Sequence, residues 1–400
     1  MEQREDSVAP ESSLWAKIRS SRRARLALRL LIAAIALAGA GFGAWLWFWT
    51  YYDPRVEVPP PVVRRFADTV PGRSTVLFLG DTASADAVLK TIRKRGHGYP
   101  FDGTRALVSG ATAAVVNLEA PITESDDPNP RRPAEYRYKI PPEAVSALRE
   151  AGVDGVTLGN NHINDYRRRG IEDTLRTLDR AGLLHAGAGL SEKQARQGFV
   201  LETPGGRLGV LSYLENQRHW RLRNLAFALD TPFHDFHGAA RLRDSDLAED
   251  IARLRRYADV IAVAPHFGHN YAPIDEDQVA LAKTCIDLGA DVVIGHHAHI
   301  AQPAGVYRGK PIFYGLGNYA FGTPVPRSQR FGMAVQLHLA AGRLAAAEVV
   351  PLLTQNRLVK FQPRIPTGRL LEEFFAEIVA PSAARGAVFE RRRDRAWLEL

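Results

Sequence analysis

Five apolar stretches of this chain, each with the length of a buried β-strand, end in side chains that can bind a metal ion. The residues at these ends are Asp81, Glu119, Asn161, His266 and the run Gly295-His296-His297-Ala298-His299. Ligand sites of open α/β sheets lie at the carboxyl ends of the strands, so we expect these side chains to meet at one edge of the fold. Histidines at positions i and i+2 of a strand end lie on the same side, which allows His297 and His299 to share an ion. His296 is then expected to face away from His297.

Strands and helices alternate along the chain from residue 75 onward, which predicts an α/β domain. The expected strands lie near 75–79, 113–117, 155–158, 207–213, 260–264, 291–295, 311–314, 333–339 and 344–351, and the expected helices near 142–151, 170–181, 244–257 and 276–288. Residues 121–141 are polar and rich in proline, and we expect them to form a long loop beside the site. The pattern alone does not distinguish a single doubly wound sheet from a sandwich of two sheets.

Residues 30–50 contain no charged side chain, and a helix of this length can cross a membrane core of roughly 30 Å. Six Lys and Arg residues lie between positions 17 and 29, whereas only Arg55, Arg64 and Arg65 follow at a similar distance, so the N-terminus is predicted to be cytoplasmic. An aromatic belt of Trp45, Trp47, Trp49, Tyr51 and Tyr52 would lie at the outer interface. A cleaved signal peptide is the alternative, because Ala36-Leu37-Ala38 resembles a cleavage site. Gly39 and Gly43 have a spacing that could pair two membrane helices in a homodimer.

The formal net charge of +8 is concentrated near the two ends of the chain, and no nucleic-acid-binding motif accompanies it. We therefore expect no nucleic acid as a partner, and an anionic membrane surface or an acidic polymer instead. The single cysteine, Cys285, excludes an intramolecular disulfide and a cysteine-based zinc cage.

Six short blocks in a fixed order resemble the bacterial capsule synthesis family that is typified by CapA- and PgsA-type poly-γ-glutamate synthesis proteins. The blocks are Gly80-Asp81, Asn117-Leu118-Glu119-Ala120-Pro121, Gly159-Asn160-Asn161-His162 with Asp165-Tyr166, His266-Phe267-Gly268, Gly295-His296-His297-Ala298-His299 with Gln302-Pro303, and Tyr314-Gly315-Leu316-Gly317-Asn318. This family is similar in turn to calcineurin-like metallophosphoesterases. The resemblance implies a four-layer β-sandwich flanked by helices, with a centre for one or two metal ions.

The resemblance also implies a role for each site residue. The expected metal ligands are Asp81, Glu119 in a bridging position, Asn161, His266, His297 and His299. Mixed oxygen and nitrogen ligands suit a divalent transition metal such as Mn, Fe or Zn. His162 is expected to face the substrate as a general acid or electrostatic stabiliser, and Asp165 to orient it.

Structural interpretations compete with several of these roles. Asp81 could cap a helix, Glu119 could be a solvated charge at a strand end, and Asn160 is better explained as a turn residue with positive φ. Two of the expected sequence patterns are also altered. Phe267 and Asn270 stand where the family commonly has Trp and Glu, and Thr82 and Ala83 follow Asp81 where metallophosphoesterases have the end of an Asp-x-His motif.

Five segments are predicted: a basic cytoplasmic segment 1–29, a transmembrane anchor 30–52, a proline-rich spacer 53–73, a CapA-like domain 74–355 and a helical, basic C-terminal appendage 356–400. The expected function is that of a membrane-anchored extracytoplasmic protein of capsule or exopolymer synthesis with a hydrolase-like metal site. Its partners would be an anionic polymer or the synthase complex in the membrane. An extracytoplasmic phosphoesterase of envelope intermediates, or a non-catalytic scaffold, are the alternatives, and the sequence leaves open whether the protein is an enzyme.

Overall fold

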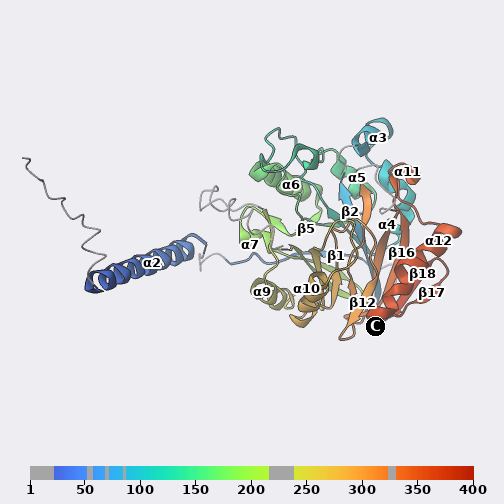
Figure 1. Cartoon of the computed structure of the whole chain (residues 1–400). Coiled ribbons are helices and arrows are strands. Elements are labelled where there is room, and N and C mark those ends of the chain that lie inside the picture. Colours follow the sequence, from blue (N-terminus) through green and yellow to red (C-terminus); the bar gives the residue numbers. More distant parts are fainter. Residues whose placement is uncertain (1–21, 52–56, 68–71, 84–86, 216–237, 323–329) are drawn as a thin grey trace, which may run out of the picture. The chain divides into compact units, whose positions relative to one another are not determined.

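A computed structural model of the protein describes residues 22–51, 57–67, 72–83, 87–215, 238–322 and 330–400. The described residues form two compact units, one ending at residue 51 and one beginning at residue 57 (Figure 1). Most of the predicted basic segment 1–29 lies outside the described residues, and so do Tyr52 and the side chains of the other aromatic-belt residues.

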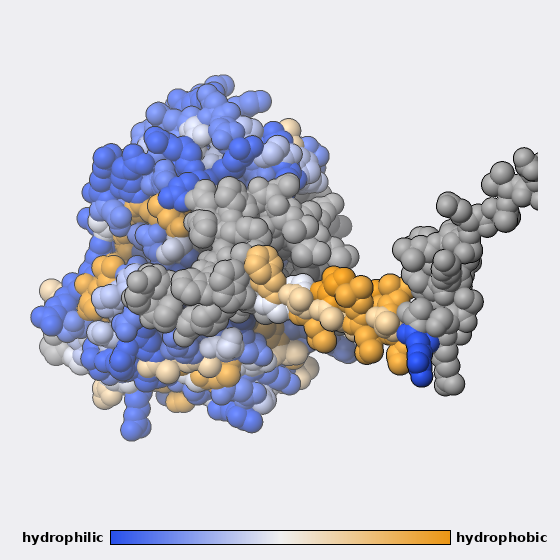
Figure 2. Space-filling view, turned by 90° about the vertical axis from the view of Figure 1, so that its left-hand side faces the viewer, coloured by the Kyte–Doolittle hydropathy of each residue, from blue (hydrophilic) through white to orange (hydrophobic). Residues whose placement is uncertain are grey.

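The first unit is one long helix, α2, which spans Arg22–Tyr51. Its most apolar window is Leu26–Gly43, with a mean hydropathy of 2.0 and none of its residues buried in the structure. The helix therefore has the length and composition to cross a membrane, as a signal sequence near an N-terminus also has. In Figure 2 its described side chains are coloured mostly hydrophobic, whereas the visible surface of the second unit is mostly hydrophilic.

The second unit contains two large mixed sheets. The seven-stranded sheet has the order β1 (Val62–Arg65), β7 (Phe199–Thr203), β8 (Gly206–Leu214), β10 (Val260–His266), β11 (Val292–Ile294), β13 (Lys310–Phe313) and β12 (Ala304–Tyr307). The nine-stranded sheet has the order β17 (Glu390–Arg392), β18 (Arg395–Glu399), β16 (Arg343–Leu353), β15 (Phe331–Ala340), β2 (Arg73–Ala83), β3 (Ala113–Leu118), β4 (Gly155–Thr157) and β5 (Leu184–Ala186), and β14 (Asn318–Phe321) also pairs with β2. A third, two-stranded sheet joins β6 (Ala188–Gly189) to β9 (Gly238–Ala239).

Helices occupy the connections between these strands. They are α3 (Ala87–Arg95), α4 (Arg105–Ser109), α5 (Ala144–Glu150), α6 (Arg167–Ala181), α7 (Glu192–Ala195), α9 (Asp244–Leu254), α10 (Glu276–Asp287), α11 (Asn356–Val359) and α12 (Arg369–Phe374), with short turns of other helix types at Tyr99–Thr104, Ala134–Tyr136, Phe375–Val379 and Ala380–Arg385. The longer helices are amphipathic. In α6, for example, Ile171, Leu175 and Leu178 are buried on one face, and Gly182 ends the helix with a φ of 63°.

Three hydrophobic cores lie between the layers of this unit. Val76 and Phe78 of β2 face a central core that also contains Phe199 of β7 and Ala262 of β10, so the two sheets pack against each other. The alternate residues of β2, among them Leu77, face an outer core that contains residues of α5 and α6. A third core lies between the seven-stranded sheet and helices α9 and α10. The order of layers is therefore helix, sheet, sheet, helix. Because both faces of the strands are covered, their sequences are continuous apolar runs.

Two terminal segments differ from the predicted description. Within the proline-rich spacer 53–73, residues Val62–Arg65 form β1 and pair in parallel with β7 at the edge of the sheet. In the C-terminal appendage, the predicted helix is present from Arg369, but the basic tail forms the hairpin of β17 and β18, which extends the nine-stranded sheet through β16. The alternation of the buried residues Ala396 and Leu398 with more exposed neighbours explains this strand.

Candidate metal centre

The predicted site residues lie at the carboxyl ends of strands from both sheets. The nine-stranded sheet supplies the oxygen ligands, because Asp81 lies in β2, Glu119 follows β3 and Asn161 follows β4. The seven-stranded sheet supplies the nitrogen ligands, because His266 ends β10, and His297 and His299 follow β11. The strands within each set run parallel, which brings these ends together at one edge of the sandwich.

A close backbone approach holds Asp81 in place. The Asp81 N–H donates a hydrogen bond to the carbonyl oxygen of Gly317 at 2.9 Å. A Cβ atom at the preceding residue, Gly80, would lie 1.9 Å from that same oxygen. Glycine is therefore required at position 80 for the last block of the sequence to reach the site.

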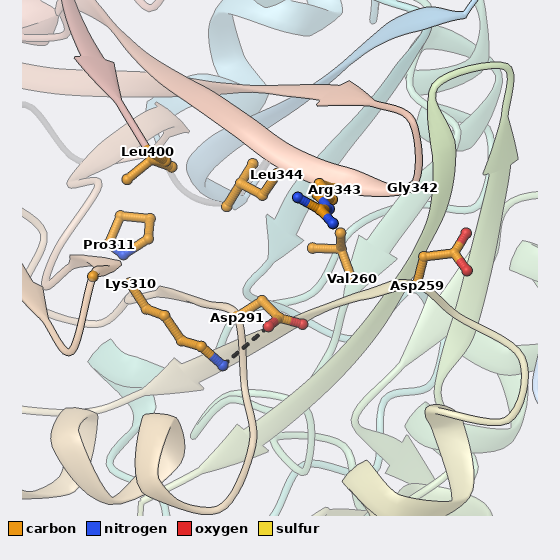
Figure 3. A pocket seen from close by; sticks show the side chains of 10 residues that line it. Asp259, Val260, Asp291, Lys310, Pro311, Gly342, Arg343, Leu344 and Leu400 are labelled. Atoms are coloured by element: carbon orange, nitrogen blue, oxygen red, sulfur yellow. Dashed lines mark hydrogen bonds and ion pairs between the residues drawn. The ribbon is translucent and has the colours of Figure 1, made fainter.

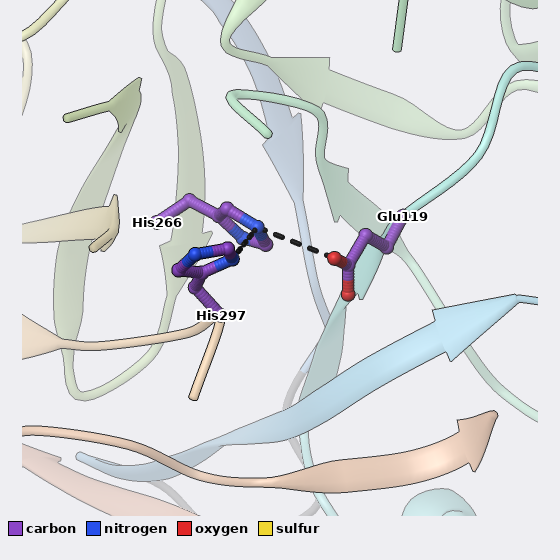
Figure 4. A group of neighbouring side chains, drawn as sticks. All are labelled: Glu119, His266 and His297. Atoms are coloured by element: carbon purple, nitrogen blue, oxygen red, sulfur yellow. Dashed lines mark hydrogen bonds and ion pairs between the residues drawn. The ribbon is translucent and has the colours of Figure 1, made fainter. Parts of the chain in front are cut away.

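Two groups of potential ligands share one residue. Glu119, His266 and His297 form the first group, and Asp81, Glu119 and His299 form the second, with the ligand atoms of each group within 4.8 Å of one another. Figure 4 shows how His266 and His297 converge with Glu119 from different segments of the chain. The structure thus brings together the residues that the sequence predicted, with Glu119 in both groups.

Short distances define the first group. His266 Nε2 lies 3.0 Å from His297 Nδ1 and 3.3 Å from Glu119 Oε1. Asn161 Oδ1 lies 2.8 Å from the same His266 nitrogen, so the predicted amide ligand points to the same place. In the second group, His299 lies 3.2 Å from Asp81 Oδ2 through Nδ1 and 3.7 Å from Glu119 Oε1 through Nε2.

The unsatisfied atoms of this cluster fit a bound cation. Among the residues that the structure describes, both carboxylate oxygens of Glu119 and Oδ2 of Asp81 are buried without a hydrogen-bond partner. Buried anionic oxygens without partners are strongly unfavourable unless they are neutralised or coordinate a metal. Two carboxylates among imidazoles form a donor set that suits a divalent transition metal.

The pKa values agree with this interpretation. Burial lowers the pKa of His266 well below its ordinary value, and burial together with the neighbouring His299 lowers the pKa of His297 to about 3. Both imidazoles are therefore neutral and keep a lone pair for a metal. Burial raises the pKa of Glu119 well above its usual value, and the charge of Asp81 adds to this effect. Burial also raises the pKa of Asp81, but the imidazoles of His296 and His299 outweigh it and hold that pKa well below the usual value.

Two asparagines that were not predicted to contact the ligands form hydrogen bonds with Asp81 and His299. The amide of Asn117 donates a hydrogen bond to Asp81 Oδ1 at 2.8 Å. Asn318 Oδ1 lies 2.9 Å from His299 Nδ1, so donation from Nδ1–H would leave Nε2 of His299 as its ligand atom. Both asparagines lie within the sequence blocks that carry the family resemblance. Their place in these blocks is the signal that could have identified them.

His162 and Asp165 form a buried pair beside the ligands. His162 Nδ1 lies 2.8 Å from Asp165 Oδ2, and the imidazole ring packs on Tyr138 with 4.4 Å between the ring centres. Burial lowers the pKa of His162, and the hydrogen bond to Asp165 opposes that effect. Asn160 supports this turn, because its side chain contacts Leu118 O and the His162 N–H. Asn160 is absent from the residues with positive φ, so the predicted left-handed turn conformation was wrong.

The histidine run does not follow the strand geometry on which its prediction was based. Strand β11 ends at Ile294, and His297 and His299 have φ values of 91° and 57°, so the chain has turned away from the strand. Both rings still reach the ligand groups. His296 points toward the site as well, with Nδ1 3.3 Å from Asp81 Oδ1, because alternation is lost where the strand ends.

Phe267, the aromatic residue of the block His266-Phe267-Gly268, belongs to the core. Phe267 is fully buried, and a Cβ at Gly295 would lie 2.5 Å from its ring. The exchange of Trp for Phe at this position therefore changes core packing. Asn270, in contrast, is exposed.

A separate cavity of about 250 Å³ lies at the opposite, amino ends of β10 and β11 (Figure 3). Val260, Pro311 and Leu344 line it together with several charged residues. Within it, Lys310 Nζ is paired with Asp291 Oδ1 at 3.0 Å. None of the predicted site residues lines this cavity.

Known proteins resemble this chain over the region that carries the site. Residues 75–323 match the family model described as Bacterial capsule synthesis protein PGA_cap. The Capsule biosynthesis protein CapA of Bacillus anthracis is 27% identical over 332 residues, which cover 82% of this chain and 77% of that protein. The PGA biosynthesis protein CapA of Bacillus subtilis (strain 168) is 27% identical over 294 residues, which cover 73% of this chain and 74% of that protein.

A Probable polyglutamine synthesis accessory protein of Mycobacterium tuberculosis is 33% identical over 231 residues, 55% of this chain and 59% of that protein. A solved structure that covers 66% of this chain at 10% identity has a TM-score of 0.34, which is too low to establish a shared fold. The family match spans more than half of the chain and contains every predicted ligand from Asp81 to His299. The chain therefore belongs to the bacterial capsule synthesis protein family PGA_cap.

Proposed function

We propose that this protein is an accessory protein of polyglutamate-type capsule synthesis with a metal-dependent, hydrolase-like centre. The observation that supports the hydrolase most directly is the pair of ligand groups that share Glu119. A shared carboxylate between two groups is the arrangement expected of a two-metal site, in which both ions act on the same substrate oxygens. The names of the relatives support the polymer, since three of them refer to capsule, PGA or polyglutamine synthesis.

The metal would be held by Asn161, His266, His297 and Glu119 on one side and by Asp81, Glu119 and His299 on the other. A divalent Mn, Fe or Zn ion in such a position supplies Lewis-acid stabilisation of charge on a substrate oxygen.

The protein's own residues supply the proton chemistry. Asp165 accepts a hydrogen bond from Nδ1–H of His162, which fixes the ring and leaves Nε2 to face a substrate. Protonated His162 would donate from Nε2 to a leaving group, and the lowered pKa makes it a stronger acid. A phosphoester or a γ-glutamyl amide would both be substrates of this chemistry.

A hydrolysis assay tests the enzyme proposal. Detergent-solubilised full-length protein would be loaded separately with Mn²⁺, Fe²⁺ and Zn²⁺ and given p-nitrophenyl phosphate, bis-p-nitrophenyl phosphate and poly-γ-glutamate. We expect turnover of at least one substrate with at least one metal, and its loss with a chelator. Turnover that is unchanged after complete removal of metal would contradict the proposal.

A non-catalytic scaffold is the second candidate, and the residues near the site give it specific support. Ala83 stands where metallophosphoesterases have the histidine of an Asp-x-His motif, and Asn270 replaces a common glutamate. A scaffold would bind the polymer or its synthase and use the metal to hold the loops around the site. Fully loaded protein that hydrolyses none of the substrates but is still needed for polymer production in cells would favour this function.

We further propose that α2 anchors the protein in the cell membrane, with its N-terminus in the cytoplasm and the second unit outside. The support is the apolar window Leu26–Gly43 and the cluster of Lys and Arg before it. A homodimer through Gly39 and Gly43 is compatible with the open space around both glycines in this helix. This topology would place the metal centre on the side where a capsule polymer emerges.

A further inference from the structure

The loop between β3 and α5 is attached to the turn that carries Asn161, His162 and Asp165. The Asn129 N–H donates to the Asp165 carbonyl oxygen at 2.8 Å, and the Tyr138 N–H donates to Asp165 Oδ2 at 2.8 Å. Arg132 lies between these two attachment points. Its backbone is also held, because the Arg132 N–H donates to the Asn129 carbonyl oxygen at 3.1 Å, and Arg137 Nε donates to the Arg132 carbonyl oxygen at 2.6 Å.

The guanidinium of Arg132 contacts both neighbours of His162 in the site. Its Nε donates to Asp165 Oδ1 at 2.9 Å, and its Nη2 donates to the backbone carbonyl oxygen of Asn161. The side chain of Arg132 is 16% exposed, and that of Asp165 is completely buried. One planar side chain therefore holds the residue that carries an amide ligand and the carboxylate that orients the imidazole.

The charge of Arg132 also has a role at this position. Asp165 is a buried carboxylate, and a buried charge is strongly unfavourable without a partner of opposite sign. Three donors surround it, namely the backbone N–H of Tyr138, the imidazole of His162 and the guanidinium of Arg132. Of these three, only Arg132 carries a permanent positive charge. It therefore places a positive charge beside the carboxylate that accepts the hydrogen bond of His162.

We propose that Arg132 is a positioning residue that sets the relative orientation of Asn161 and His162, so that the metal ligand and the proton donor are placed by one group. The part that concerns His162 rests on the proposed hydrolase function, whereas the part that concerns Asn161 rests on the ligand geometry alone. Lysine is a poor substitute, because a single ammonium group does not reproduce two divergent donors in a fixed plane.

The test compares Arg132→Gln and Arg132→Lys with the control Arg169→Gln. Arg169 lies on the neighbouring helix α6 and pairs at the surface with Asp173, so the control removes the same charge from outside the site. The ties of Asn129 and Tyr138 to Asp165 remain in all three variants, and we expect them to fold. Mn²⁺ affinity, measured by electron paramagnetic resonance, should fall by roughly 10–100-fold in Arg132→Gln, the usual effect of losing an outer partner of a ligand.

Steady-state kinetics and chemical rescue separate positioning from other roles. We expect kcat to fall by roughly 10–100-fold in Arg132→Gln with a smaller change in KM, and both the Mn²⁺ affinity and kcat to recover partly when ethylguanidinium is added. Arg132→Lys should recover less than half of either loss. A rise in KM alone would show that Arg132 binds substrate and would overturn the proposal.

Mn²⁺ affinity tests the positioning role of Arg132 even if the protein hydrolyses no substrate. If the wild-type protein hydrolyses no substrate, the proposed function fails, but the Mn²⁺ affinity and its rescue by ethylguanidinium still test the orientation of Asn161. If Arg132→Gln unfolds, Arg132→Lys provides the same comparison with the charge retained. Mn²⁺ affinity in either variant equal to that of Arg169→Gln would refute the positioning role.

Discussion

Glu119 is the single residue on which both ligand groups depend, so its replacement should affect the whole centre. In Glu119→Gln the charge that two ions would share is lost, whereas His297→Ala removes a ligand from the first group only. We expect metal content, measured by elemental analysis, to fall toward zero in Glu119→Gln and to fall only partly in His297→Ala. The exposed Glu135 on the loop between β3 and α5 provides the control Glu135→Gln, which should keep wild-type metal content. Equal metal content in Glu119→Gln and the control would show that no ion binds here.

Replacement of His162 should have a different effect, because this residue lies beside the ligands but outside both groups. In His162→Ala, Asn161 and the other ligands remain, so metal content should stay at the wild-type level. Hydrolysis of an activated phosphoester should fall by about 10²–10⁴-fold, the usual scale of general acid-base assistance. His297→Ala should lose activity together with the part of the metal that the first group would hold. Activity in His162→Ala within a factor of two of wild type would exclude proton donation by this residue.

The sequence predicted which residues gather in the two groups better than it predicted their surroundings. Asp81, Glu119 and His266 could be found because each ends an apolar strand, and strand ends follow from local composition. Arg132 could not be assigned, because its role depends on how a long loop folds back on a distant turn. The φ values of His297 and His299 were also beyond prediction, since they depend on where β11 stops pairing.

Among the elements, the attachment of α9 to β8 depends on one buried carboxylate. Asp250 of α9 is fully buried and accepts hydrogen bonds from Arg196 at 2.8 and 2.9 Å, from Tyr213 of β8 at 2.6 Å and from Arg253 at 2.7 Å. The side chain of Arg196 is only 7% exposed, so water cannot replace it easily.

Arg196→Met should therefore destabilise the second unit. Breaking a buried pair by removing one partner costs up to about 3–5 kcal/mol, and the buried charge of Asp250 would keep only Arg253 and Tyr213 as partners. The matched control is Arg207→Gln, which breaks the more exposed pair with Asp259 and should cost about 1 kcal/mol or less. Urea unfolding of both variants measures the difference. A loss in Arg196→Met no larger than in the control would mean that Asp250 is compensated by its other partners.

The elements themselves were predicted well where the local pattern is long. Helices α6, α9 and α10 and strands β2, β3, β8, β10, β15 and β16 match the predicted stretches. β1 and the hairpin of β17 and β18 were missed for a physical reason. A short edge strand gains its stability from the partner it pairs with, and that partner lies far away in the sequence.

On the scale of the whole molecule, the proposed topology predicts where the second unit is found. Alkaline phosphatase fused after residue 60 should be active and a cytoplasmic reporter at the same position inactive, because the Lys and Arg residues between positions 17 and 29 would keep the N-terminus inside. The full-length protein should remain in the membrane after carbonate extraction. A shorter, soluble product would instead identify the N-terminal segment as a cleaved signal peptide.

The division into two sheets marks the limit of what sequence alone could establish about the architecture. The alternation of strands and helices predicted an α/β unit, and the structure confirms it. Which strands belong to which sheet is decided by pairing between distant residues, as where β15 and β16 join β2. Only the family resemblance separated a sandwich from a single sheet.

The candidate oxygen ligands come from one sheet and the candidate nitrogen ligands from the other, so metal binding at this centre would stabilise the packing of the two sheets against each other. An ion that needs both sets gains its full binding free energy only in molecules whose sheets are already packed together. Such an ion stabilises the native state by about 2.7 kcal/mol when its free concentration is 100 times its Kd. With the topology proposed above, the supply of metal outside the cell would then affect the fraction of the protein that is folded there, independently of any catalysed reaction.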